Sequence, residues 1–222
     1  MKKRLLFVGF MCISLLVKAQ TKTNQYTIRT LAFYNLENLF DTINDPNKND
    51  EASPMMKLKG NKSKVYWDKI EKLGSVISQI GFDKAKTGPA IIGVSEVENR
   101  AVLEDLVKSK HLKKMNYDII HYESPDKRGI DVAILYQKRY FKPIYHESFT
   151  PTIFRNNFRV YTRDQLLVSG YLDDELIHVI VNHWPSRSGG EAATRQLREK
   201  AAYQNTRIID KIQETDPNAK IF

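Results

Sequence analysis

Short apolar runs that alternate with helical patterns constrain the fold of this chain more than any other feature of its sequence. The runs predict β-strands at residues 31–34, 90–94, 117–122, 130–136, 159–172 and 176–181. Amphipathic patterns predict helices at 65–80, after Asn99 and at 192–213, and the first of these is expected to bury a stripe from Trp67 to Ile80. Direct hairpins join some strands and helical crossovers join others. This mixture predicts an α/β fold with mixed sheets rather than a purely parallel, doubly wound sheet.

A histidine, an arginine and two glycines follow the last predicted strand and precede a predicted helix. Leu176–Val181 leads directly into His183, Arg187 and the pair Gly189–Gly190, before the helix predicted from residue 192. Backbone N–H groups and the helix dipole favour an anion where a helix begins, and the glycines let the backbone turn closely. The stretch therefore predicts phosphate chemistry, with the Arg187 guanidinium as a candidate substrate contact.

The first 19 residues have the pattern of a secretory signal peptide. Three basic residues open the segment, an apolar region runs from Leu5 to Val17, and Val17–Lys18–Ala19 fits a cleavage site. The segment is too short and too weakly flanked for a stable membrane span. We therefore expect an exported protein, periplasmic or extracellular, that begins at Gln20 and has no transmembrane segment after cleavage. An uncleaved N-terminal anchor is the alternative.

Cleavage would change two properties that bear on function. The single cysteine, Cys12, lies in the removed segment, so disulfide and thiol chemistry are excluded for the mature protein. The same segment carries four basic residues and no acidic ones, so the formal net charge falls from +9 to +5. A moderate positive charge attracts polyanions, but it does not choose between nucleic acid, anionic lipid and a solubilised surface.

Polar residues recur at the ends of the predicted apolar strands, at Asn35, Glu96, Arg128, Arg163 and His183. A rigid strand can aim the residue at its end into a cleft. Asn35 and Glu96 offer hard oxygen ligands that suit Mg²⁺, Mn²⁺ or Ca²⁺. His183 could give a hydrogen bond or a proton to a phosphoryl oxygen, and the two arginines could pair with phosphate.

Four of these residues also have a purely structural alternative. Asn35 could turn the chain after its strand, and Glu96 could be a first-turn acid that the helix dipole favours, a role that Glu98 fits better. His183 could be a structural histidine. Arg163 could belong to an exposed ion pair that contributes little to stability.

Five segments, taken together in their order along the chain, are more specific than any single residue. They are Ala32–Asp41, Ile91–Val97, Arg128–Tyr136, Tyr161–Asp164 and Asn182–Trp184. In order and spacing they resemble the endonuclease/exonuclease/phosphatase superfamily, in its deoxyribonuclease-like and sphingomyelinase-like branch. The resemblance implies a four-layer α/β sandwich of two mixed β-sheets flanked by helices, and divalent-metal-dependent hydrolysis of a phosphoester.

The resemblance also implies a role for each residue of the set. Glu96 would ligate the divalent ion, and Asn35 would help to hold that ion or orient the phosphate. His183 would be the catalytic donor to the scissile phosphate, with Arg163 and Arg128 as substrate clamps. A metal ion offsets charge in the transition state of such a reaction, and fixed donors add electrostatic stabilisation.

The chain departs from the family pattern toward its C-terminus. That pattern continues with a strand ending in Gly-Asp-x-Asn and, much later, a Ser-Asp-His segment, whereas this chain ends at Asn218–Phe222, which resembles the first residues of that strand. We therefore expect residues 20–222 to be the N-terminal portion of a single domain. We also expect these 222 residues to be inactive by themselves.

The combined pattern predicts a secreted phosphodiesterase, with an endonuclease acting on nucleic acid as the first choice. A phospholipid or small-phosphoester hydrolase of the same fold is one alternative, and a non-catalytic exported binding domain is another. No stable protein partner is predicted. Substrate choice is expected to lie in loops such as residues 41–64, which carry no readable code.

Overall fold

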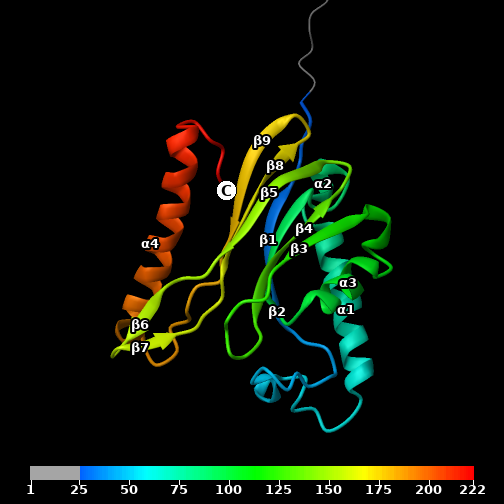
Figure 1. Cartoon of the computed structure of the whole chain (residues 1–222). Helices are drawn as coiled ribbons and strands as arrows, with labels where there is room; N and C mark the ends of the chain where they lie inside the picture. The colour runs from blue at the N-terminus through cyan, green and yellow to red at the C-terminus, as the bar shows by residue number, and fades with distance from the viewer. Residues whose placement is uncertain (1–25) are drawn as a thin grey trace, which may run out of the picture.

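Two β-sheets face each other in the middle of this computed structural model, which describes residues 26–222 (Figure 1). Helices α1 (Lys62–Gln79) and α3 (Arg100–Lys108) cover the outer face of one sheet, and α4 (Glu191–Thr215) runs along the outside of the other. The predicted four-layer α/β sandwich is therefore confirmed. The predicted signal peptide lies outside the described residues. No helix in the part of the chain from residue 26 onward is long and apolar enough to cross a membrane.

The first sheet is mixed and carries the candidate site at one end. Its strands stand in the order β1 (Leu31–Leu39), β2 (Ile91–Val97), β4 (Asp131–Gln137) and β3 (Tyr117–His121). β1 and β2 are parallel, and the other neighbours are antiparallel. Apolar side chains on its outer face form one core with α1 and α3, which includes the fully buried Leu36, Ile92 and Leu106.

The second sheet packs on the inner face of the first. Its strands β5 (Phe141–Phe149), β8 (Gln165–Leu172) and β9 (Glu175–Val181) are antiparallel, and β9 gains a parallel bridge from His178 to Ile221. A second core lies between the sheets, where Ile134 meets Val168 and Val181. Gly93 marks a close approach, since a Cβ atom there would stand 2.9 Å from Val181 Cγ2.

Helix α1 buries the predicted stripe except at its first position, Trp67. The buried residues include Tyr66, Ile70, Leu73 and Ile77, whereas the side chain of Trp67 is 49% exposed. Spacings of four, three and four follow the 3.6-residue repeat of a helix, and Trp67 stands about 100° away from that stripe. The prediction for Trp67 was wrong because the buried stripe begins at Tyr66, one position earlier.

The strands of the second sheet differ from the prediction in number and extent. The run at 159–172 is interrupted, with β7 (Phe158–Val160) and β8 separated by an irregular segment. β5 and β6 (Ile153–Arg155) were not predicted. β5 is an edge strand that contains Pro143 and is largely exposed, so it lacks the apolar pattern of a buried strand. The remaining elements are the short helices α2 (Phe82–Ala85), η1 (Asp50–Ala52) and η2 (Lys113–Met115).

Candidate active site

Asn35 and Glu96 meet at the carboxyl ends of the parallel strands β1 and β2. The side-chain amide of Asn35 donates a hydrogen bond to Glu96 Oε1 at 3.0 Å, and the backbone N–H of Asn38 donates to Glu96 Oε2 at 2.9 Å. Asn35 Oδ1 in turn accepts from the backbone N–H of Glu37 at 2.7 Å. These contacts hold the carboxylate in one orientation at the edge of the sheet.

Both strands are irregular at this point, and the irregularity aims the Glu96 side chain. The register of β2 shifts between Ser95 and Val97 against β4, and that of β1 shifts after Asn35. Glu96 itself has a φ of 59°, in the left-handed region that glycine or asparagine usually occupies. Such a conformation costs on the order of 1–3 kcal/mol and tends to be kept where function needs it.

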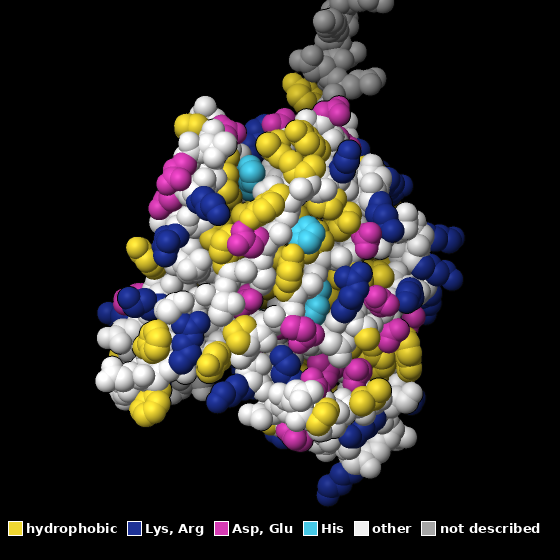
Figure 2. Space-filling model, in the orientation of Figure 1, with side chains coloured by type: hydrophobic (Ala, Val, Ile, Leu, Met, Phe, Trp, Pro, Cys, Tyr) yellow, Lys and Arg dark blue, Asp and Glu magenta, His cyan; other side chains and the backbone are white. Residues whose placement is uncertain are grey.

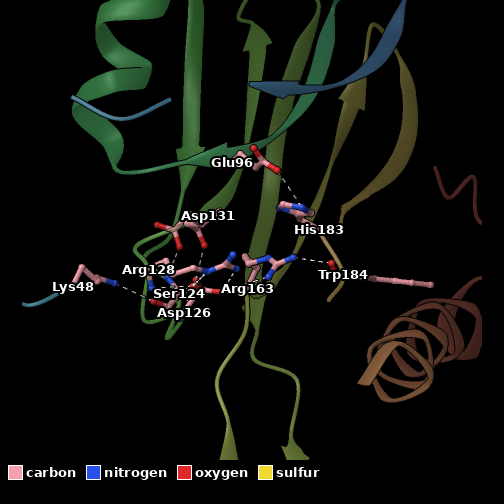
Figure 3. A network of polar contacts seen from close by, with 10 residues as sticks. Lys48, Glu96, Ser124, Asp126, Arg128, Asp131, Arg163, His183 and Trp184 are labelled. Carbon is pink, nitrogen blue, oxygen red and sulfur yellow. Dashed lines mark hydrogen bonds and ion pairs between the residues drawn. The ribbon is translucent and has the colours of Figure 1, made fainter. Parts of the chain in front are cut away.

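His183 comes from the opposite sheet and faces Glu96. It follows the end of β9, and its Nε2 lies 3.7 Å from Glu96 Oε1 (Figure 3). Burial, together with the positive charge of Arg163, lowers the pKa of His183 to about 4, although Glu96 acts in the opposite direction. The imidazole is therefore neutral at neutral pH. Its Nδ1 is buried and has no hydrogen-bond partner among residues 26–222.

A buried ion-pair cluster lies beside His183. The Arg128 guanidinium donates two hydrogen bonds of 3.0 Å each to the Asp126 carboxylate, and Arg163 Nη1 lies 3.4 Å from the same carboxylate. Burial alone would raise the pKa of Asp126, but the hydrogen bonds and charges of Arg128 and Arg163 outweigh it and lower the pKa below its usual range. Asp126 is therefore a stable anion that organises both arginines.

The two arginines of this cluster differ in exposure and in what they hold. The Arg163 side chain is only 6% exposed, and its Nη2 donates to the backbone carbonyl of Trp184 at 2.7 Å (Figure 3). It thereby fixes the loop that carries His183. The Arg128 side chain is 53% exposed, so its guanidinium can reach a ligand in the adjoining groove.

A second cluster supports the loop that carries Asp126. His121, Glu123 and Asp131 place potential ligand atoms within 4.8 Å of one another and could hold a metal ion. In this structure, however, Asp131 is fully buried, bonds His121 at 3.0 Å and accepts from the Ser124 N–H. The Lys48 ammonium lies 3.3 Å from Glu123 and so already supplies a positive charge. We therefore regard this cluster as structural support.

The residues at the end of β1 and β2 fit a hard divalent cation better. Mg²⁺ is commonly bound by one or two protein oxygen ligands, with waters and substrate phosphate completing its shell. Glu96 supplies a carboxylate that is 20% exposed, and the Asn35 side chain next to it carries an amide oxygen that here accepts from the Glu37 N–H. The neutral His183 nearby adds no charge that would repel a cation.

The structure brings together five of the six predicted site residues. Asn35, Glu96, His183, Arg128 and Arg163 converge as described above. Arg187 does not join them: its side chain is 73% exposed and pairs with Glu191 at 3.9 Å. The roles of these residues remain predictions.

Three supporting residues were not identified as such from the sequence. Asp126 was not among the candidate residues, although its place two residues before Arg128 is a usable signal. Lys69 gave no signal: it reaches from α1 to the backbone carbonyl of Asn38 at 2.9 Å, which holds the irregular end of β1. Glu98 is buried and accepts from the Asp41 N–H at 2.6 Å, and burial raises its pKa to about 7.

Residues 30–222 match the family described as "Endonuclease/Exonuclease/phosphatase family". No curated protein matches the chain. Among solved structures, TDP2 from Caenorhabditis elegans is similar, with 18% identity and a TM-score of 0.52 over 71% of this chain and 41% of that one.

A second similar structure is the mannosyl-6-phosphatase Bt3783 of Bacteroides thetaiotaomicron VPI-5482. It shares 16% identity with a TM-score of 0.50, over 87% of this chain and 63% of that one. The chain thus spans less than two thirds of either structure's length. At these identities the likeness establishes the shared fold.

Proposed function

Because the chain belongs to the endonuclease/exonuclease/phosphatase family, we propose that it hydrolyses phosphoester bonds with the help of a divalent metal ion. One observation carries the proposal: Asn35, Glu96 and His183, which lie far apart in the sequence and on two different sheets, meet at one end of the sandwich. A buried arginine–aspartate cluster adjoins them.

Each side chain has a definite task in this proposal. Glu96 and Asn35 hold the cation, which when bound polarises a phosphoryl oxygen and offsets negative charge in the transition state. His183, neutral because of its low pKa, donates a hydrogen bond to the phosphate without bringing a net charge. Arg128 pairs with a phosphate oxygen from the groove, and Arg163 keeps the His183 loop in place.

We further propose that the substrate is a nucleic acid. The groove next to the cluster, of about 370 Å³, is lined by Lys127, Arg128, Arg155, Arg159 and Arg163, with Asp126 as its acidic residue. Positive charge along a groove is the main source of affinity for a phosphodiester backbone. Small phosphomonoesters and phospholipid headgroups share the reacting group, so they are the alternatives for the assay to separate.

We also propose that the protein is exported, on the strength of the pattern in its first 19 residues. Sequencing the N-terminus of protein recovered from the cell exterior or periplasm tests this, with Gln20 as the expected first residue. Recovery of the intact Met1 terminus in the cytoplasm would contradict it.

The decisive experiment measures nicking of plasmid DNA by the full-length gene product, with Mg²⁺ and with excess chelator. Glu96→Ala and His183→Ala are each expected to lower the rate by at least about 100-fold, as loss of a preorganised transition-state contact does. Glu104→Gln and His111→Gln are the matched controls, because both residues lie on the surface around α3 and pair only with neighbouring side chains.

The possible results separate an error in the site from an error in the substrate or in the activity. Full chelator-sensitive activity in both site variants would refute the site assignment. Activity on p-nitrophenyl phosphate or on phosphatidylcholine vesicles but not on DNA would keep the chemistry and reject the nucleic-acid substrate. No metal-dependent hydrolysis of any phosphoester would favour a non-catalytic binding protein. Running the same assay on residues 20–222 alone tests the prediction that this portion is inactive.

A further inference from the structure

The two short strands β6 and β7 form a hairpin whose faces differ in chemistry. Their register pairs Phe154 with Arg159 and Arg155 with Phe158 across the ladder. The two-residue turn is Asn156–Asn157, with φ values of 49° and 63°, as a tight hairpin turn requires. Because directly paired residues share a face and successive residues alternate, Phe154 and Arg159 point to one side and Arg155 and Phe158 to the other.

The face that carries Phe154 and Arg159 continues into a row of rings and guanidinium groups. The Arg159 guanidinium carbon lies 5.7 Å from the centroid of the Phe154 ring and 5.9 Å from that of Tyr161. A hydrogen bond of 3.0 Å to the Pro151 carbonyl steadies Arg159. The rings remain open to solvent, with Phe154 60% and Tyr161 49% exposed.

This row is continuous with the candidate active site. Arg159 and Tyr161 line the same groove as Arg128 and Arg163, the two arginines that hold Asp126. Figure 2 shows Lys and Arg side chains interleaved with hydrophobic ones at the lower left, where Figure 1 places the hairpin. A ligand whose phosphate lies beside Arg128 would therefore run outward past Tyr161 toward Phe154.

The composition of the groove indicates the occupant. Its lining has five cationic side chains and the single acidic Asp126, so it suits a chain with several negative charges. Exposed rings placed between those cations suit flat aromatic groups spaced along that chain. Single-stranded nucleic acid has both properties, because each unpaired base offers a face for stacking and each linkage carries a phosphate. In a duplex the bases already stack on one another.

A membrane surface fits the hairpin less well. Insertion into lipid needs an apolar tip or one apolar face, but the tip here is Asn156–Asn157. The two phenylalanines lie on opposite faces, and each shares its face with an arginine. The hairpin therefore cannot bury both rings in a bilayer without also carrying a guanidinium group toward the hydrocarbon region.

We propose that Phe154, Arg159 and Tyr161 form a subsite that stacks the bases of a single-stranded nucleic acid and leads its backbone into the active site. The inference rests on the proposed function, since the bound strand is the substrate of that site. It adds the strandedness of the substrate and the surface that recognises it.

The test measures binding of a fluorescein-labelled twelve-residue oligothymidylate by fluorescence anisotropy, in chelator so that turnover plays no part. Phe154→Ala and Tyr161→Ala should each weaken binding by roughly fivefold or more, as loss of one stacking ring does. Phe154→Leu, which keeps the apolar bulk, should weaken it similarly. Phe82→Ala is the matched control and should bind as the unaltered protein does, because Phe82 is a similarly exposed phenylalanine on α2 that does not line the groove.

A second probe separates stacking from simple charge attraction. An abasic oligomer of the same length has the phosphates without the bases, so the unaltered protein should bind it more weakly than oligothymidylate. Phe154→Ala should reduce this difference. Equal binding of the two oligomers by the unaltered protein, or unchanged binding in both ring variants, would overturn the inference.

Two further measurements separate failure of the subsite from failure of the proposed hydrolysis. Co-sedimentation with phosphatidylglycerol vesicles that is lost in both Phe154→Ala and Phe158→Ala would overturn the inference in favour of a membrane contact. Hydrolysis of bis(p-nitrophenyl) phosphate by the full-length gene product with Mg²⁺ tests the chemistry separately from strand binding. If that hydrolysis is present and oligothymidylate does not bind, the proposed function survives and the subsite does not.

Discussion

Glutamine in place of His183 and glutamine in place of Glu98 should change the pH dependence of stability in opposite directions. Burial is the leading cause of both pKa shifts, which take His183 from 6.5 to about 4 and Glu98 from 4.5 to about 7. The His183 side chain is 23% exposed and Glu98 is 6% exposed, so solvent screens neither shift strongly. Burying either side chain in its charged form lowers the free energy of unfolding.

The signs follow from proton linkage. Between about pH 4 and 6.5 the unfolded chain binds a proton at His183 that the native protein does not, so this residue stabilises the fold at higher pH and loses that effect on acidification. Between about pH 4.5 and 7 the native protein holds a proton at Glu98 that the unfolded chain has released. Glu98 therefore stabilises the fold at lower pH and loses that effect as pH rises.

The two effects have similar size and nearly cancel in the unaltered protein. Each pKa differs by about 2.5 pH units between the folded and unfolded states, which corresponds to about 3 kcal/mol. Relative to the unaltered protein, His183→Gln should gain about 3 kcal/mol of unfolding free energy when the pH falls from 6.5 to 4. Glu98→Gln should gain about the same when the pH rises from 4.5 to 7.

Urea denaturation followed by tryptophan fluorescence, at half-unit pH steps in chelator, measures these differences. Chelator is needed because a cation bound near Glu96 would add its own pH dependence. All other titrating groups are common to the three proteins, so their contributions largely cancel in the comparison. Parallel stability curves for the unaltered protein and His183→Gln would refute the claim that His183 is held neutral by burial. Parallel curves for Glu98→Gln would refute the corresponding claim for Glu98.

Three more predictions concern single contacts, and each is checked by urea or thermal denaturation. Asp126→Asn should lower the free energy of unfolding by about 3–5 kcal/mol, because it leaves the buried Arg163 without its counter-charge. The surface variant Asp118→Asn should lower it by less than about 1 kcal/mol. Equal losses in the two variants would contradict the role of the buried cluster. Gly93→Ala should cost about 1–3 kcal/mol, because the new Cβ would press on Val181 across the two sheets, and a stabilising effect would be inconsistent with that packing. Asn99→Ala should cost about 1 kcal/mol, since Asn99 caps α3 by accepting from the Val102 N–H, and an unchanged midpoint would show that the cap is dispensable.

The elements that carry the site could be predicted from the sequence because their signals are local. An apolar run that ends in Asn35 or Glu96 has the composition of a buried strand whatever lies next to it, and an asparagine before an amphipathic run marks the start of a helix at Asn99. The mixture of hairpins and crossovers was enough to predict mixed sheets. Those patterns extend over a few residues, so no distant contact is needed to read them.

The tertiary structure decided which of the candidate side chains work together. Arg163 and Arg187 carry the same guanidinium group, yet one is buried beneath the His183 loop and the other is exposed beside Glu191. The hairpin of β6 and β7 escaped prediction because its strands have three residues each and are largely exposed. Strands of three residues are too short to show a periodic signal.

The sequence by itself therefore determined the strands and helices that carry the site and the polar residues at their ends, because both follow from local composition and periodicity. It did not determine that Glu96 and His183 would face each other at 3.7 Å. That contact depends on a register shift that turns Glu96 and on the packing of one sheet against the other. Such a geometry arises from many weak contacts between residues distant in the chain, so only the folded structure could reveal it.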